Sequence, residues 1–131
     1  APWTLLIYML GAKLSKNSIN IKKVKEKESE VNLIINKLID YLCVHIKNQI
    51  EAGADVVQVF DSWAGLIPQI DLMNYCLSPN LKIVDFCKEE KIPVICFPRG
   101  IYKNYKEFNN IVKPDGLNFL ISLMGHHIFL I

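Results

Sequence analysis

Hydrophobic positions along the chain follow two patterns, short continuous runs and longer stretches with helical spacing. Three runs, at residues 3–10, 56–60 and 94–97, are nearly apolar throughout. Runs without a polar face are typical of strands buried on both sides in a parallel sheet. A fourth strand is predicted to open at residues 115–118, where Asp-Gly-Leu-Asn follows the last helical pattern.

The longest helical pattern lies between the first two runs. Its apolar residues recur every three or four positions: Val31, Ile34, Ile35, Leu38, Leu42, Ile46 and Ile50. This spacing predicts an amphipathic helix, with Gly53 as the stop signal just after it. Two shorter helices are expected at residues 68–77 and 80–88, separated by a break at 78–79, and another at residues 101–112. The polar stretch at 17–27 indicates a loop and a short helix.

Strands and helices therefore alternate along the chain, which predicts right-handed βαβ units and an α/β fold with a parallel sheet. Both an open doubly wound sheet and part of a (β/α) barrel fit this order. The sequence contains neither G-x-G-x-x-G nor G-x-x-x-x-G-K-[ST], the glycine patterns of nucleotide-binding folds. A complete barrel needs about 250 residues, so this chain of 131 residues can supply roughly half of one.

Composition narrows the class of protein further. Half of the residues are hydrophobic and 21% are charged, the balance of a globular chain. The net charge is only +2, and the lysines at 13–27 are followed closely by glutamates, so nucleic acid is not an expected partner. The apolar run at 117–131 is shorter than the roughly 20 residues that span a bilayer, so no membrane partner is expected either.

The four cysteines, Cys43, Cys76, Cys87 and Cys96, form no C-x-x-C pair and no zinc-binding spacing with histidine. Their separation along the chain favours an interpretation as small buried apolar side chains in a reducing compartment. No metal site is therefore predicted.

Polar residues follow two of the predicted strands at their carboxyl ends, where parallel α/β proteins carry their chemistry. Tyr8 comes near the end of the first run, and Asp61 and Ser62 directly follow the second. On local sequence alone, Tyr8 is a ring that closes the mouth of the sheet and Ser62 is a turn or helix-capping residue. Both would face the same edge of the sheet.

Two segments around these positions carry a resemblance to a known family. Residues 1–9 read Ala-Pro-Trp-Thr-Leu-x-x-Tyr-Met, and residues 49–65 read Gln-Ile-Glu-Ala-Gly-Ala-Asp-Val-Val-Gln-Val-Phe-Asp-Ser-Trp-Ala-Gly. Both resemble signatures of the uroporphyrinogen decarboxylases. Residues 92–97 and 114–118 fall where that family has its next two strands. The resemblance extends from residue 1 to residue 118.

The resemblance implies a cytoplasmic, homodimeric enzyme with a (β/α)8 TIM barrel, of which residues 1–118 are a part. Such an enzyme converts the four acetate side chains of uroporphyrinogen III to methyl groups, giving coproporphyrinogen III and CO2 without a metal or organic cofactor. The family's active-site tyrosine falls on Tyr8 and its substrate-contacting serine on Ser62. The family's catalytic aspartate lies upstream of Ala1, so Asp61 is expected to orient its loop. Arg99 is expected on the surface.

The resemblance ends after Asn118. Residues 119–131 do not match the family's continuation and are interpreted as a divergent apolar tail, which a reading-frame shift would explain. Because the family's arginine loop and catalytic aspartate are missing, we expect this chain alone to be inactive. Two alternatives remain: a non-catalytic remnant of a decayed gene, and a relative among the zinc-dependent methyltransferases of the same superfamily, whose His-x-Cys ligand set is not seen here.

Overall fold

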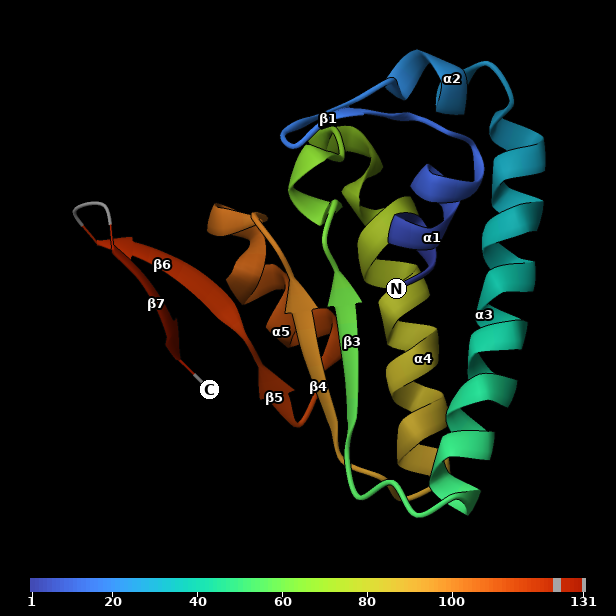
Figure 1. Ribbon diagram of the computed structural model, residues 1–131, viewed down its shortest axis with the longest axis vertical. Helices are drawn as coiled ribbons and strands as arrows, with labels where there is room; N and C mark the ends of the chain where they lie inside the picture. Colours follow the sequence, from blue (N-terminus) through green and yellow to red (C-terminus); the bar gives the residue numbers. More distant parts are fainter. Residues whose placement is uncertain (124–125, 131) are drawn as a thin grey trace.

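The predicted parallel sheet is present in the computed structural model, which describes residues 1–123 and 126–130, with side chains described as far as residue 119. Three strands lie in the order β3 (Val57–Asp61), β4 (Val94–Pro98) and β5 (Gly116–Leu117), all parallel (Figure 1). The strands predicted at 56–60 and 94–97 are thus confirmed. The strand predicted to open at 115–118 is present as the two-residue strand β5. The described residues thus form an α/β structure with a three-stranded parallel sheet, and a closed barrel is not seen among them.

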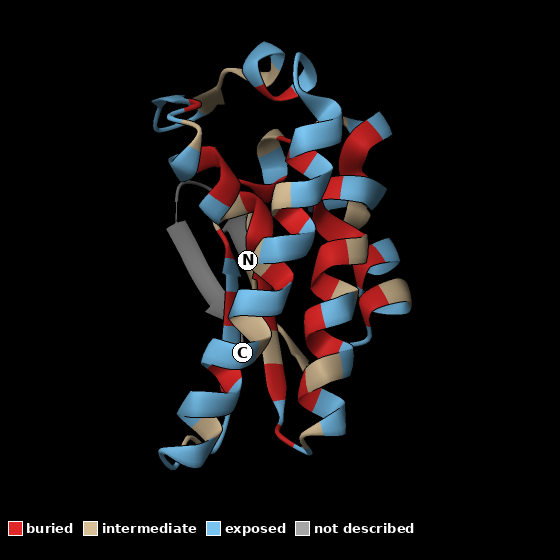
Figure 2. Cartoon of the chain, turned by 90° about the vertical axis from the view of Figure 1, so that its right-hand side faces the viewer, coloured by how far each residue is buried: buried red, intermediate tan, exposed pale blue. Residues whose placement is uncertain are grey.

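The helices pack on one face of this sheet, and Gln58 and Phe60 on the other face of β3 are exposed. Helices α1 (Pro2–Met9), α3 (Glu28–Glu51) and α4 (Ser78–Glu89) pack against one another, and α5 (Tyr105–Val112) packs against α4 (Figure 1). The buried residues collect where these helices meet the sheet, while the outer faces of the helices are exposed (Figure 2). No helix in the described part of the chain is both long enough and apolar enough to cross a membrane.

Helix α3 confirms the longest predicted helix. Its buried residues Val31, Ile35, Ile39 and Ile46 lie on one stripe at helical spacing, so the helix buries its apolar face against α1 and α4. The helix ends at Glu51, and Gly53 follows with φ of +101°. That left-handed conformation is easily reached only by glycine, which explains why the chain turns at this point.

The prediction of a strand at residues 3–10 was wrong, because this segment forms helix α1. Pro2 occupies the first turn, where its missing N–H costs nothing. Trp3, Leu6 and Ile7, at positions i, i+3 and i+4, are fully buried, whereas Tyr8 on the other side is exposed. Since nearly every residue of the segment is apolar, its apolar residues show no spacing of three or four that would indicate a helix. The chain therefore opens with a helix, and the predicted strand–helix order is corrected at its start.

The predicted helix break at 78–79 was also wrong. A 3₁₀ turn (Gln69–Asp71) leads into a π-helical segment (Met73–Leu77), which continues directly into α4. Pro79 sits in the first turn of α4, where proline is tolerated. The side-chain amide of Asn80 donates to the carbonyl of Cys76 (2.8 Å), so a side chain supplies a hydrogen bond within this irregular stretch. An irregular helix replaces the two separate ones.

The polar stretch after α1 is more ordered than a loop. It forms a small antiparallel hairpin of β1 (Lys13–Ser15) and β2 (Ser18–Ile19), which was not predicted, followed by the predicted short helix α2 (Ile21–Lys25). The ammonium group of Lys25 forms an ion pair with the buried carboxylate of Asp71. This pair attaches α2 to the turn that precedes the π-helical segment.

The tail begins with a hairpin of two antiparallel strands, β6 (Phe119–Leu123) and β7 (His126–Leu130). Residues 124–125 and 131 lie outside the described residues. The ring of Phe119 lies 5.5 Å from that of Tyr105, between ring centres. The interpretation of residues 119–131 as a divergent, frameshifted tail stays a prediction.

All four cysteines are free thiols. Cys76, Cys87 and Cys96 are buried, as predicted, and Cys43 is half-buried. Burial raises the pKa of Cys87 to about 11 and that of Cys96 to about 12. Thiols with such pKa values are neutral near pH 7 and act as apolar packing groups. Among the described residues, no group of three or more histidine, cysteine, aspartate or glutamate side chains is placed to hold a metal ion.

Candidate functional site

The loop after β3 is held in place by helix α1. The indole nitrogen of Trp3 donates a hydrogen bond to the carbonyl oxygen of Trp63 (3.0 Å). On its other side the Trp3 ring stacks on Tyr75, with ring centres 5.1 Å apart and planes 14° from parallel. Because Trp3 and Tyr75 are both buried, α1 is fixed between the β3 loop and the π-helical segment.

Asp61, the last residue of β3, joins three elements through its carboxylate. The hydroxyl of Thr4 in α1 donates to one carboxylate oxygen (2.8 Å), and the amide of Asn80 in α4 donates to the other (3.3 Å). The backbone N–H of Trp63 in turn donates to the Thr4 hydroxyl (3.4 Å). Asp61 is 1% exposed, so these bonds place it inside the fold, where it fixes the β3 loop against two helices.

Burial raises the pKa of the Asp61 carboxyl, and the positive charge of the Ala1 amino group and the hydrogen bonds from Thr4 and Asn80 offset this only in part. Because the native pKa lies above that of the unfolded chain, the native state holds its proton more tightly. Stability from this group is therefore present at low pH and is lost as the pH rises through the native pKa.

The variant Asp61→Asn tests this pH dependence. Asparagine keeps the size of the side chain, but it has one accepting oxygen in place of two, so Thr4 and Asn80 lose one acceptor and we expect a constant loss of stability. It also removes the titration, so the stability of the parent chain relative to the variant should fall as the pH rises above about 4. Urea unfolding of both proteins across a pH series measures this difference. A difference that does not change with pH would contradict the assignment.

Tyr8 and Ser62, the two predicted substrate-binding residues, are both close to Trp63. Tyr8 is 53% exposed, and its ring meets the Trp63 ring edge-on at 6.1 Å between centres. Ser62 directly precedes Trp63 and is half-buried. Within the described residues, neither hydroxyl forms a side-chain hydrogen bond, so both are available to a ligand.

Sequence reasoning missed a cation at this place. The ammonium group of Lys13, in strand β1, lies 5.4 Å from the centre of the Trp63 ring. Trp63 is thus contacted by the ring of Tyr8 and by the charge of Lys13. No sequence signal points to this contact, because it depends on the β1–β2 hairpin, which reaches the loop after β3 (Figure 1).

The loops after β3 and β4 meet in a close backbone contact. Arg99 is half-buried rather than fully exposed, and its N–H donates to the Asp61 carbonyl (3.1 Å) while its carbonyl accepts from the Gly65 N–H (2.9 Å). A methyl group on Gly65 would lie only 2.7 Å from the carbonyl oxygen of Gly100. Gly65 is therefore required for the loops to touch, and Gly100, with φ of +82°, adopts a conformation that favours glycine.

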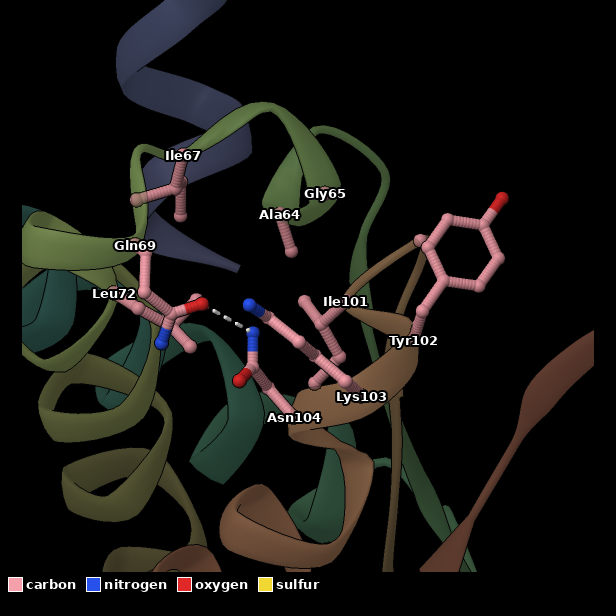
Figure 3. A pocket seen from close by; sticks show the side chains of 10 residues that line it. Ala64, Gly65, Ile67, Gln69, Leu72, Ile101, Tyr102, Lys103 and Asn104 are labelled. Atoms are coloured by element: carbon pink, nitrogen blue, oxygen red, sulfur yellow. Dashed lines mark hydrogen bonds between the residues drawn. The ribbon is translucent and has the colours of Figure 1, made fainter.

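Beside this contact lies a pocket of about 340 Å³ (Figure 3). Its apolar lining comes from Ile67, Leu72 and Ile101, and its polar lining includes Lys103 and a hydrogen-bonded pair of amides, in which Asn104 donates to Gln69 (2.9 Å). The pocket opens at the carboxyl ends of β3 and β4. This is the edge at which parallel α/β proteins bind their ligands.

The fold and the position of these residues define an α/β protein with a pocket at the carboxyl ends of a parallel sheet. Comparison with known proteins narrows this class. The family model described as Uroporphyrinogen decarboxylase (URO-D) matches residues 1–119. The chain belongs to the uroporphyrinogen decarboxylase family.

Individual relatives agree with this assignment. A uroporphyrinogen decarboxylase of Orientia tsutsugamushi is 37% identical over 121 residues, which are 89% of this chain and 35% of the relative. One of Rickettsia akari is 37% identical over 123 residues, covering 88% of this chain and 35% of the relative. One of Campylobacter jejuni is 38% identical over 104 residues, covering 77% and 31%. The chain thus spans about a third of the length of these relatives.

Proposed function

We propose that residues 1–118 are part of the catalytic domain of a uroporphyrinogen decarboxylase, a (β/α)8 barrel that converts the acetate arms of uroporphyrinogen III to methyl groups. The match of the family over residues 1–119 carries this proposal. The parallel order of β3, β4 and β5 supports it, because consecutive parallel neighbours are the arrangement found in such a barrel. In this proposal the complete enzyme is a cytoplasmic homodimer that uses no cofactor.

Tyr8 and Ser62 are the proposed substrate-binding residues in this chain. Both carry hydroxyl groups that can donate a hydrogen bond to a substrate carboxylate. Neither hydroxyl donates to a side chain among the described residues. A pyrrole ring of the substrate first takes up a proton and then accepts the electron pair of the C–C bond that breaks as CO2 leaves. Protonation of the resulting CH2 carbon and loss of the added ring proton give the methyl group. A carboxylate stabilises the positive charge of that ring. We place this carboxylate on a residue upstream of Ala1, since Asp61 is buried and committed to Thr4 and Asn80.

The isolated chain is proposed to be inactive, because it contains Tyr8 and Ser62 without the upstream carboxylate or the arginines. A chimera tests the proposal: residues 1–118 replace the corresponding segment of the Orientia tsutsugamushi relative. Formation of coproporphyrinogen by the purified chimera, and none by the 131-residue chain, is the expected result. A chimera that folds but forms no coproporphyrinogen would contradict the assignment, and activity of the isolated chain would refute the proposed inactivity.

Within this chimera, Ser62→Ala and Tyr8→Phe are each expected to lower kcat/KM by about tenfold, the loss of one hydrogen bond to a charged group. Ser29→Ala and Tyr41→Phe, at exposed positions in α3, are the matched controls and should leave kcat/KM unchanged. Steady-state assays of coproporphyrinogen formation give the ratio. Equal kcat/KM values for the site variants and their controls would remove both residues from the substrate-binding set.

A further inference from the structure

The pocket between the loops after β3 and β4 has a shape that its backbone keeps open. Gly65 and Gly100 approach so closely that a side chain at position 65 would overlap the backbone of Gly100. Since both residues are glycines, no side chain from either one fills the space beside the contact. The 3₁₀ turn Tyr102–Asn104 forms the opposite wall. Tyr102 holds φ of +34°, which a non-glycine residue rarely adopts and which often marks a ligand-binding loop.

The apolar wall of the pocket suits a flat ring. Ile67 and Ile101 are buried residues whose side chains reach the pocket, and Leu72 completes this wall (Figure 3). A volume of about 340 Å³ is at the lower end of the range for small-molecule pockets. The space therefore suits one ring with a short arm rather than an entire tetrapyrrole.

The charged residue that lines the pocket, Lys103, favours an anionic ligand. The amine of Lys103 points into the pocket between Ala64 and Asn104 (Figure 3). No aspartate or glutamate lines the pocket, and Lys103 forms no ion pair within the residues that the structure describes. An ammonium group without a protein partner, at the end of an apolar cleft, pairs with a carboxylate that a ligand brings.

We propose that this pocket binds a carboxylate-bearing arm attached to a flat ring. Lys103 pairs with the carboxylate, and the ring packs against the apolar wall of the pocket. The inference rests on the proposed function in one respect: the natural source of the arm is a peripheral side chain of the porphyrinogen. The pocket lies on the loop that carries Ser62, so it would hold one arm of the substrate while the reacting ring lies elsewhere.

Binding of a small probe tests this proposal on the 131-residue chain itself. The probe is 3-phenylpropionate, and its uncharged counterpart is 3-phenylpropionamide. We expect 3-phenylpropionate to shift the backbone amide signals of Gly65 and Gly100 saturably in heteronuclear NMR spectra. The uncharged probe should bind about fivefold to tenfold more weakly, which is the effect of one charge-assisted hydrogen bond in a partly exposed site.

Variants of Lys103 identify the counter-charge. Lys103→Met should weaken 3-phenylpropionate binding by about fivefold to tenfold, whereas Lys103→Arg should retain most of the affinity. Lys106→Met removes an exposed lysine one turn further along, outside the pocket, and should change nothing. Equal affinity of the parent and Lys103→Met, or shifts that do not saturate at Gly65 and Gly100, would overturn the proposal.

The outcomes for the pocket and for the enzyme are separable. If the probe does not bind but the chimera forms coproporphyrinogen, the pocket proposal fails and the proposed function stands. If the probe binds through Lys103 but the chimera is inactive, the pocket remains a carboxylate site and the assignment of its natural ligand fails with the proposed function.

Discussion

Replacing Trp3 with alanine is expected to lower the free energy of unfolding by about 3–5 kcal/mol, the usual cost of removing a fully buried aromatic side chain. Trp3 is completely buried, stacks on Tyr75 and donates to the carbonyl of Trp63. Its loss opens a cavity between α1 and the π-helical segment and leaves a carbonyl without its donor. For a domain of this size, such a loss is a large part of the total stability.

Urea unfolding followed by circular dichroism measures the effect of Trp3→Ala. Trp3→Phe, which keeps a stacking ring but loses the N–H donor, should fall between the parent and the alanine variant. Leu5→Ala, on the exposed side of the same helix, is the matched control, with an expected loss of about 0.5 kcal/mol. A loss for Trp3→Ala no larger than that of Leu5→Ala would show that α1 is not docked as described.

Gly65→Ala is expected to destabilise the protein by about 3 kcal/mol, at the upper end of the usual cost of overpacking. The added methyl group would meet three backbone atoms of Gly100, at 2.7 to 2.9 Å. Because these are backbone atoms, they cannot rotate out of the way as a side chain would. The loops after β3 and β4 must separate, which breaks the hydrogen bond from Gly65 to the Arg99 carbonyl.

Gly53→Ala separates this steric effect from the general cost of replacing a glycine. At Gly53 an added methyl group meets nothing within 4 Å, but the backbone has φ of +101°, so its cost of about 1–2 kcal/mol comes from conformation alone. Urea unfolding of both variants gives the comparison. If Gly65→Ala is no more destabilising than Gly53→Ala, the loops are not in contact in solution.

Much of the fold follows from periodicity in the sequence. Helix α3 could be predicted because its apolar residues recur at helical spacing over many turns, and β3 and β4 because short apolar runs end at turn residues. Helix α1 could not, since a segment that is apolar on every face has no period to detect. The Ser78-Pro79 pair was misinterpreted because proline ends a helix in its interior but is tolerated in a first turn.

The candidate site was predictable only in part. Tyr8 and Ser62 were identified because they lie within segments that resemble a family, and their local sequence alone suggested structural roles. Lys103 and the pocket were not foreseen, because the pocket depends on contact between Gly65 and Gly100, which are 35 residues apart. A glycine a few residues after each of two parallel strands was the only signal, and glycine is common in such turns.

The packing of α1 against the β3 loop also determines what the intrinsic tryptophan fluorescence of the protein reports. The chain has two tryptophans, Trp3 and Trp63, both buried and joined by a hydrogen bond. Intrinsic fluorescence excited at the tryptophan band therefore reports on a single place, the junction between α1 and the β3 loop. Helices α3 and α5 carry no tryptophan, so tryptophan emission does not report directly on changes in these helices. One chromophore pair thus observes the local environment of the proposed substrate-binding residues without any label.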